Sequence, residues 1–366
     1  MAHKLSISLF CILTLFSSAG SSGNIKKVDP INFLSPANIE AARTIYSEEL
    51  TKILTERKAS NFVLGRSQQG RNIEAYFFPG TSNKRALVIG GMHGSELSSI
   101  EVAKQLLQTL KTGDSIFYNV IIIPSLFPDN AEAAKRLPAQ IGGVENIGRY
   151  SFPGAVDPNR QMPTPGHAFD EEDALDHAGR KIENENTFLL DLIDQYRPQR
   201  IVNLHAIRDT SHAGVFADPR TNEKGIALGY ETDSMLAVTI AKHIKQHGGH
   251  IPGNCLHKKP TALYYKDPVP APAGYFQKRN FSGSALPGKR GGGVSLGTWA
   301  STAVVNEQEP AKNRDAMRIL TMEFPGSKRP TDYNSKNEQV FYQQQVELYA
   351  AALKNIFLGE YLIEEN

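Results

Sequence analysis

The sequence predicts a single α/β domain in which a mixed, mostly parallel, twisted sheet is flanked by helices on both faces. Short apolar runs typical of buried strands alternate with longer segments whose apolar residues recur every three or four positions. No change in composition along the 366 residues is long enough for a linker, and no internal repeat is present. Hydrophobic residues make up 40% of the chain and charged residues 21%, which suffices for one large core.

The order of the elements supports this fold class. We expect strands at residues 61–64, 73–78, 86–90, 119–124, 200–204 and 318–324, and helices at about 36–56, 96–110, 185–196, 234–247 and 339–357. Residues 137–180 and 252–298 are rich in Gly and Pro and predict long loops. Loops of that length in a compact domain are typical of a binding face.

The first residues resemble a secretory signal. Lys4 precedes an apolar run over residues 5–16, and small residues follow over 17–23, with Ser17 and Ala19 in a small-x-small pattern. The run is too short to span a bilayer. We therefore expect a signal peptide over 1–23, a catalytic domain over 24–366, a secreted or periplasmic location and no stable membrane insertion after cleavage. A retained membrane anchor is the alternative.

Charge and cysteine usage exclude some functions. The net charge of +2 and the lack of a basic run argue against a nucleic-acid partner. After signal removal Cys255 is the one remaining cysteine, so no internal disulfide is expected, and a buried small residue is the favoured interpretation over a nucleophile. The sequence predicts no oligomeric state.

Metal-binding side chains follow two of the predicted strands. His93 and Glu96 come after the strand at 86–90, and His205 closes the strand at 200–204. Imidazole nitrogens and a carboxylate oxygen are good zinc ligands, and a set of two His and one Glu leaves a coordination position open for catalysis. One zinc ion is therefore predicted at this edge of the sheet. The alternatives are a chance H-x-x-E and an ordinary buried histidine.

Glu323 is the candidate general base. It stands near the end of the strand at 318–324, between Met322 and Phe324, where burying a carboxylate is costly without a purpose. Zinc lowers the pKa of bound water to about 7, and a carboxylate can take its proton as it attacks a carbonyl. A helix cap or a surface carboxylate is the alternative.

Two motifs carry a resemblance to a known family. Residues 65–71 match G-x-S-x-x-G-R, and residues 91–96 match the zinc motif G-x-H-G-x-E. From about Ser35 to Pro325 the chain resembles the zinc carboxypeptidases of the carboxypeptidase A superfamily. It resembles most their bacterial murein peptide amidase A branch, which trims cell-wall peptides. The resemblance implies a zinc carboxypeptidase-like fold.

The resemblance also implies residues that act on the substrate. Arg136 follows Pro128-Asp129, similar to the arginine after the family's N-P-D-G segment that stabilises the oxyanion, with Lys135 and Arg149 as competitors. Residues 156–160 match V-D-x-N-R, in which Asn159 and Arg160 would hold a free substrate carboxylate. An arginine that only stabilises a loop is the alternative for Arg160.

A third segment, residues 295–299, resembles the family's G-S-x-G-S-W, where Trp299 either lines the pocket or packs. Lys289 and Arg290 would either meet a second substrate carboxylate or remain solvated. The mobile tyrosine of the animal enzymes has three candidates, Tyr264, Tyr265 and Tyr275.

Together these features predict a secreted zinc carboxypeptidase or amidase that acts on small peptides. The resemblance implies murein peptides, cut at the γ-D-glutamyl-diaminopimelate bond. An N-acyl amino acid hydrolase similar to succinylglutamate desuccinylase or aspartoacylase is one alternative, and a general secreted metallocarboxypeptidase is another. A binding module that has lost its chemistry is the third, although all three metal ligands and the general base are present.

Overall fold

A computed structural model of the chain describes residues 47–113, 115–144, 146–152, 154–254 and 292–360. The predicted signal peptide, Cys255, the three candidate tyrosines, Lys289 and Arg290 lie outside the described residues. Within these ranges, no helix has the length and apolar character needed to cross a membrane.

The sheet has seven strands in the order β1-β2-β4-β3-β5-β7-β6. Their bounds are β1 Ser60–Arg66, β2 Asn72–Phe78, β3 Arg85–Ile89, β4 Asn119–Ile123, β5 Arg200–Ile207, β6 Gly214–Ala217 and β7 Arg318–Pro325. The four central strands are parallel, and β1, β2 and β6 are antiparallel to their neighbours. The predicted mixed sheet is confirmed, and β6 is a short strand that the sequence pattern did not predict.

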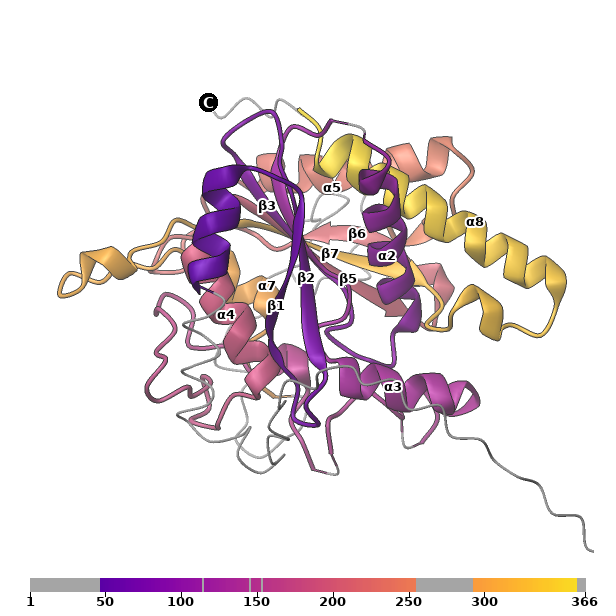
Figure 1. Cartoon of the computed structure of the whole chain (residues 1–366), viewed down its shortest axis with the longest axis horizontal. Helices are drawn as coiled ribbons and strands as arrows, with labels where there is room; N and C mark the ends of the chain where they lie inside the picture. The colour runs from indigo at the N-terminus through magenta and orange to yellow at the C-terminus, as the bar shows by residue number, and fades with distance from the viewer. Residues whose placement is uncertain (1–46, 114, 145, 153, 255–291, 361–366) are drawn as a thin grey trace, which may run out of the picture.

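Helices cover both faces of this sheet (Figure 1). One core lies between the sheet and the helices α2 Leu97–Lys111, α5 Tyr230–Gln246 and α8 Lys336–Ala352. The other includes the helix over residues 47–56, α4 Asn184–Tyr196 and the short α7 Leu296–Ala300. The predicted arrangement of helices on both faces is therefore confirmed.

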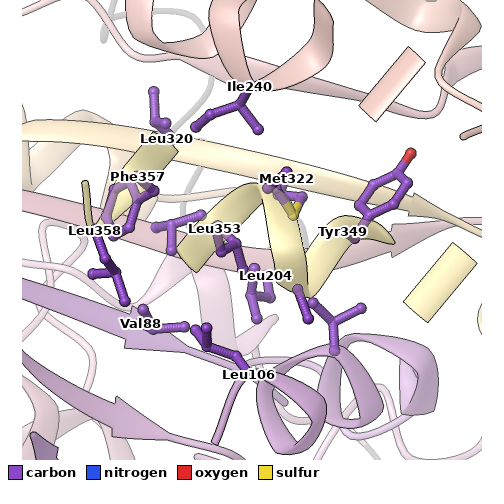
Figure 2. Close-up of a cluster of buried hydrophobic side chains, with 14 of the residues drawn as sticks. Val88, Leu106, Leu204, Ile240, Leu320, Met322, Tyr349, Leu353, Phe357 and Leu358 are labelled. Atoms are coloured by element: carbon purple, nitrogen blue, oxygen red, sulfur yellow. The ribbon is translucent and has the colours of Figure 1, made fainter. Parts of the chain in front are cut away.

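Alternate residues of the central strands enter the two cores. Val88, Leu204 and Leu320 belong to the first core, whereas Leu87 and Ile201 belong to the second. Figure 2 shows Leu353 and Phe357, which follow α8, on the side of the first core. Because both faces are buried, the strands read as continuous apolar runs rather than as alternating patterns.

The connections of the central strands create a crevice at one edge of the sheet. Helix α2 links β3 to β4 on one face, and α4 precedes β5 on the other face. The strand order therefore reverses between β3 and β5, and ligands of open α/β sheets bind outside the carboxyl ends of the strands at such a point.

Candidate metal centre

A tight turn brings His93 and Glu96 to the carboxyl end of β3. Gly91 has φ +65°, a conformation that favours glycine. A Cβ at Gly94 would stand 2.2 Å from the backbone nitrogen of Ala131, so only glycine fits against helix α3, Pro128–Arg136. Glu96 is the N-cap residue of α2, so both side chains leave the chain within one turn.

The structure brings the three predicted ligands together. One ligand atom from each of His93, Glu96 and His205 lies within 4.8 Å of the other two. The two carboxylate oxygens of Glu96 lie 3.0 Å from His93 Nδ1 and 2.9 Å from His205 Nδ1. All three side chains are buried. One carboxylate between two imidazoles is a donor set that fits a zinc ion.

The electrostatics of the cluster also fit a cation. Burial by itself would lower the pKa of His93, but the carboxylates of Glu96 and Asp157 raise it to about 9. Burial by itself would raise the pKa of Glu96, whereas His93 and His205 bring it well below its usual range. The carboxylates around His93 therefore stabilise positive charge at this place, which a bound divalent ion supplies.

Asp157 is a further member of the cluster that the sequence pattern did not predict. Its Oδ1 lies 2.8 Å from His93 Nε2 and accepts a hydrogen bond from the backbone of Asn159 at 2.9 Å. A carboxylate on the second nitrogen of a ligating histidine fixes the orientation of the ring and raises its basicity. The available signal was the Asp of V-D-x-N-R, which stands two residues before Asn159.

Arg149, rather than the predicted Arg136, lies at the cluster. Arg149 donates to Glu96 Oε1 at 3.0 Å and to Asp157 Oδ2 at 2.8 Å, and it lines the cavity described below. Burial would lower the pKa of Arg149, but these two carboxylates raise it. Arg136 is exposed and does not line the cavity. The reason is that α3 packs on Gly94 through Ala131, and five further residues carry the chain roughly 7 Å away.

Glu323 lies beside the ligands. It pairs directly with His205 across β5 and β7, and it lines the same cavity. Burial raises the pKa of Glu323; the charge of His205 opposes that shift and the carboxylate of Glu96 adds to it. A half-buried carboxyl with a raised pKa next to a metal site suits a group that takes up and releases a proton.

Asn159 and Arg160 lie in a single 3₁₀ turn, Pro158–Arg160, at the cavity wall. Asn159 Nδ2 lies 3.4 Å from His205 Nε2, and its Oδ1 accepts a hydrogen bond from the backbone of Leu296 at 3.0 Å. Arg160 Nη1 donates to the carbonyl oxygen of Asn159 at 2.6 Å. The turn thus places an amide and a guanidinium next to the ligands, where a substrate carboxylate can bind.

Trp299 packs and does not line the cavity. It is fully buried, its Nε1 donates to the carbonyl oxygen of His167 at 3.0 Å, and the Arg314 guanidinium lies 4.3 Å from its ring centre. Its neighbour Thr298 lines the cavity instead. The packing alternative for the tryptophan therefore fits the structure.

The cavity over this cluster has a volume of about 590 Å³. Its wall includes the three ligands, Arg149, Arg160 and Glu323 together with residues from three other segments, namely Arg208 and Asp209, Asp218, and Ser295 and Thr298. A site of this size accommodates a small ligand such as the end of a peptide.

No family model and no curated protein sequence matches this chain. Among solved structures, it is similar to a protein from Shewanella amazonensis SB2B assigned as a metallopeptidase, with 16% identity, a TM-score of 0.47 and coverage of 88% of this chain and 95% of that chain.

It is also similar to bovine thrombin-activatable fibrinolysis inhibitor in complex with tick carboxypeptidase inhibitor (12% identity, TM-score 0.46, coverage 86% and 96%). A third similar structure is murein-tripeptide amidase MpaA from Escherichia coli O157 (15%, 0.41, 83% and 93%). The chemistry of the site is therefore inferred from its own geometry.

Proposed function

We propose that the protein is a zinc-dependent hydrolase that cleaves an amide bond next to the free carboxyl end of a small peptide. One observation carries this proposal. His93, Glu96 and His205 converge within 4.8 Å at the wall of a cavity, and Glu323 pairs with His205 on the neighbouring strand. Such an arrangement is typical of an open metal site with a half-buried acid–base group beside it.

Each residue has a role that its position supports. His93, Glu96 and His205 would hold a divalent ion, which when bound would acidify water and polarise a carbonyl oxygen. Glu323 takes the proton of the attacking water and returns it to the leaving amine. Arg149 stabilises the negative charge that develops on the carbonyl oxygen. Arg160 and Asn159 hold the terminal carboxylate, which fixes the bond to be cut over the ligands.

We further propose that the substrate is a cell-wall peptide, cut between γ-D-glutamate and diaminopimelate, and that the protein acts outside the cytoplasm. The resemblance of residues 65–71, 91–96 and 156–160 to the murein peptide amidase branch supports the substrate, and the apolar run over residues 5–16 supports the location. Hydrolysis of ordinary peptides or of N-acyl amino acids remains the competing activity.

The test compares three substrates with the purified, zinc-loaded protein: a cell-wall tripeptide, a dipeptide with an ordinary α-peptide bond, and an N-acyl amino acid. Products are read by mass. We expect the cell-wall peptide to be cleaved fastest, activity to disappear with a chelator, and added zinc to restore it. Preference for the N-acyl amino acid would replace the proposed substrate, and no cleavage of any of the three would refute the hydrolase.

Glu323→Gln tests the general base. We expect kcat to fall by about 10²- to 10⁴-fold because the amide cannot accept the proton, while the zinc content is unchanged. Glu347→Gln, which alters an exposed carboxylate on α8, serves as the matched control and should be as active as the wild type. Wild-type activity of Glu323→Gln would rule out this role.

A further inference from the structure

Two histidines lie at the C-terminal end of α5, outside the cavity. His243 belongs to the last turn of the helix, and His247 is its C-cap residue. Neither side chain lines the cavity that holds His93, Glu96 and His205. The proposed hydrolysis does not use this pair, which leaves both rings for another ligand.

The helix brings the two rings together. Side chains four residues apart lie on one face of a helix, separated by about one turn. The ring centres of His243 and His247 are 4.2 Å apart, and the ring planes are inclined by 39°. Another flank of α5, with Leu236, Ile240 and Ile244, is buried in the first core. His243 is half-buried and His247 is exposed, so ions in solution can reach the rings.

The hydrogen bonds of the pair leave ring nitrogens for a metal. Nδ1 of His247 lies 2.8 Å from the carbonyl oxygen of His243 and donates a hydrogen bond to it. The neutral ring then carries its lone pair on Nε2, the form in which an imidazole binds a metal. The ring of His243 has no hydrogen-bond or ion-pair partner among the described residues, so either of its nitrogens can be a ligand.

The electrostatics of the pair favour a metal ion over a proton. Burial lowers the pKa of His243, and the charge of a protonated His247 lowers it further. His243 is therefore neutral near pH 7, as metal binding requires. The pair also lies at the C-terminal end of α5, where the helix dipole is negative and stabilises a bound cation.

The catalytic histidines provide a measure of the required geometry. The ring centres of His93 and His205 are 5.0 Å apart, and their planes are inclined by 51°. Two imidazoles on one tetrahedral zinc ion, each with its nitrogen about 2.1 Å from the metal, have ring centres roughly 5 Å apart. The rings of His243 and His247 are closer by 0.8 Å, the difference between 5.0 Å and 4.2 Å. A small rotation of the exposed His247 side chain removes this difference.

The ligand set determines the class of ion. Among the described residues, the catalytic cluster is the only group of three possible ligands, so no third side chain joins the pair on α5. Water therefore completes the coordination of an ion bound there. Imidazole nitrogens suit Cu²⁺, Ni²⁺ and Zn²⁺, whereas Ca²⁺ and Mg²⁺ require oxygen ligands.

We infer that His243 and His247 form a second, peripheral metal site, which binds one divalent transition-metal ion through two imidazole nitrogens. Cu²⁺ should bind most tightly, as it does to most nitrogen ligands. The bound ion stabilises the folded protein, because the two rings are adjacent only when α5 is helical. This site is independent of the proposed function.

The experiment titrates Ni²⁺ into the zinc-loaded full chain and follows the heat of binding. We expect the wild type to bind one Ni²⁺ ion per chain while it retains its zinc, which metal analysis checks. His243→Gln and His247→Gln each lack one ligand, so their nickel affinity should fall by about 10-fold or more. Added Ni²⁺ should raise the unfolding temperature of the wild type and have much less effect on the two variants.

His250→Gln is the matched control. His250 is also exposed and follows α5, but it is not part of the pair, so nickel affinity should equal that of the wild type. Bound Cu²⁺ gives a second measurement with the zinc-loaded protein. Its paramagnetic resonance spectrum should show coupling to two imidazole nitrogens in the wild type and in His250→Gln, but to one in His243→Gln and His247→Gln. Unfolding without added metal checks that all variants fold.

Two results would overturn the inference. One is the absence of nickel binding by the zinc-loaded wild type, and the other is unchanged nickel affinity in both His243→Gln and His247→Gln. Because neither measurement uses a peptide, either result would leave the proposed hydrolase intact. Failure of the proposed hydrolysis would in turn leave the metal site on α5 in place.

Discussion

Two groups of buried or half-buried carboxylates in the same molecule have pKa values that are shifted in opposite directions. Glu96 and Asp157 lie among His93, His205 and Arg149, and their pKa values are lowered in spite of burial. Glu183 and Glu185, at the start of α4, have raised pKa values because burial dominates. No cation pairs with Glu183 or Glu185 among the described residues, and the nearby Asp129 adds to the negative charge.

The difference shows that the charged partners of a buried carboxylate, rather than its burial alone, set the direction of its pKa shift. The first group is compensated by imidazoles and a guanidinium, so it holds its negative charge for a metal ion. The carboxylates of the second group accept hydrogen bonds but have no cationic partner among the described residues. Ser151 and Gln161 donate to Glu183, and the backbone of Gln68 donates to Glu185 at 3.3 Å. The two groups are joined through Gln161, which donates to Glu183 and lies next to Arg160 in the sequence.

Of the substitutions in the first group, replacement of Arg149 should lower the activity most. We expect Arg149→Met to lower kcat by about 10²- to 10³-fold, since the variant lacks the donor for the developing negative charge. Arg149→Lys keeps the charge without the fork and should retain part of the activity. The measurement is kcat with the best substrate, with thermal unfolding as the check that the variants fold.

Arg136→Met is the matched control for this prediction. Arg136 is exposed at the end of α3 and outside the cavity, so the variant should keep wild-type kcat. Loss of activity in Arg136→Met with full activity in Arg149→Met would restore the role that the sequence predicts for Arg136.

Asp157→Asn should have a smaller effect on the same group. The asparagine can no longer balance the charge of His93, so we expect zinc affinity to fall by about 10- to 100-fold. Competition with a chromophoric chelator measures this affinity without any substrate. Asp129→Asn alters another short ion pair, with Arg71 at 2.6 Å, but touches no ligand, and its zinc affinity should stay at the wild-type value. Equal affinities in both variants would refute the orienting role of Asp157.

Much of the fold could be predicted because the central strands are apolar on both faces. Runs such as Arg85–Ile89 and Asn119–Ile123 are short and bounded by turn residues, which favours their assignment as buried strands. Strand β6 was missed because four residues, Gly214–Ala217, carry too little pattern, and they gain their pairing from β7. Helix α3 was missed for a related reason, since its apolar positions are nearly all alanine.

Site residues could be predicted only where a short stretch of sequence fixes their positions relative to one another. His93 and Glu96 share one turn, so their spacing is informative. The choice between Arg136 and Arg149 depends on the direction of α3 and on the path of the following loop, which a spacing does not encode. The place of Asp218 in the cavity could not be predicted from the sequence either, because it follows from the register of β6 on β7.

The second group of carboxylates can be tested through stability. The pKa of Glu185 is raised from 4.5 to about 8, first by burial and then by the charges of Glu183 and Asp129, against hydrogen bonds from its own backbone and that of Gln68. A raised pKa contributes stability that is fully present below pH 4.5 and is lost as the pH rises through 8, because the unfolded chain then releases the proton more readily than the folded one.

Glu185→Gln cannot ionise and keeps an acceptor for the N–H of Gln68. It should therefore unfold at the same temperature as the wild type near pH 5 and several degrees higher at pH 9. Glu347→Gln removes an exposed carboxylate and should follow the wild type at every pH. A difference for Glu185→Gln that stays constant from pH 5 to pH 9 would mean that Glu185 is ionised in the folded protein. The contrast between the two groups of carboxylates would then disappear.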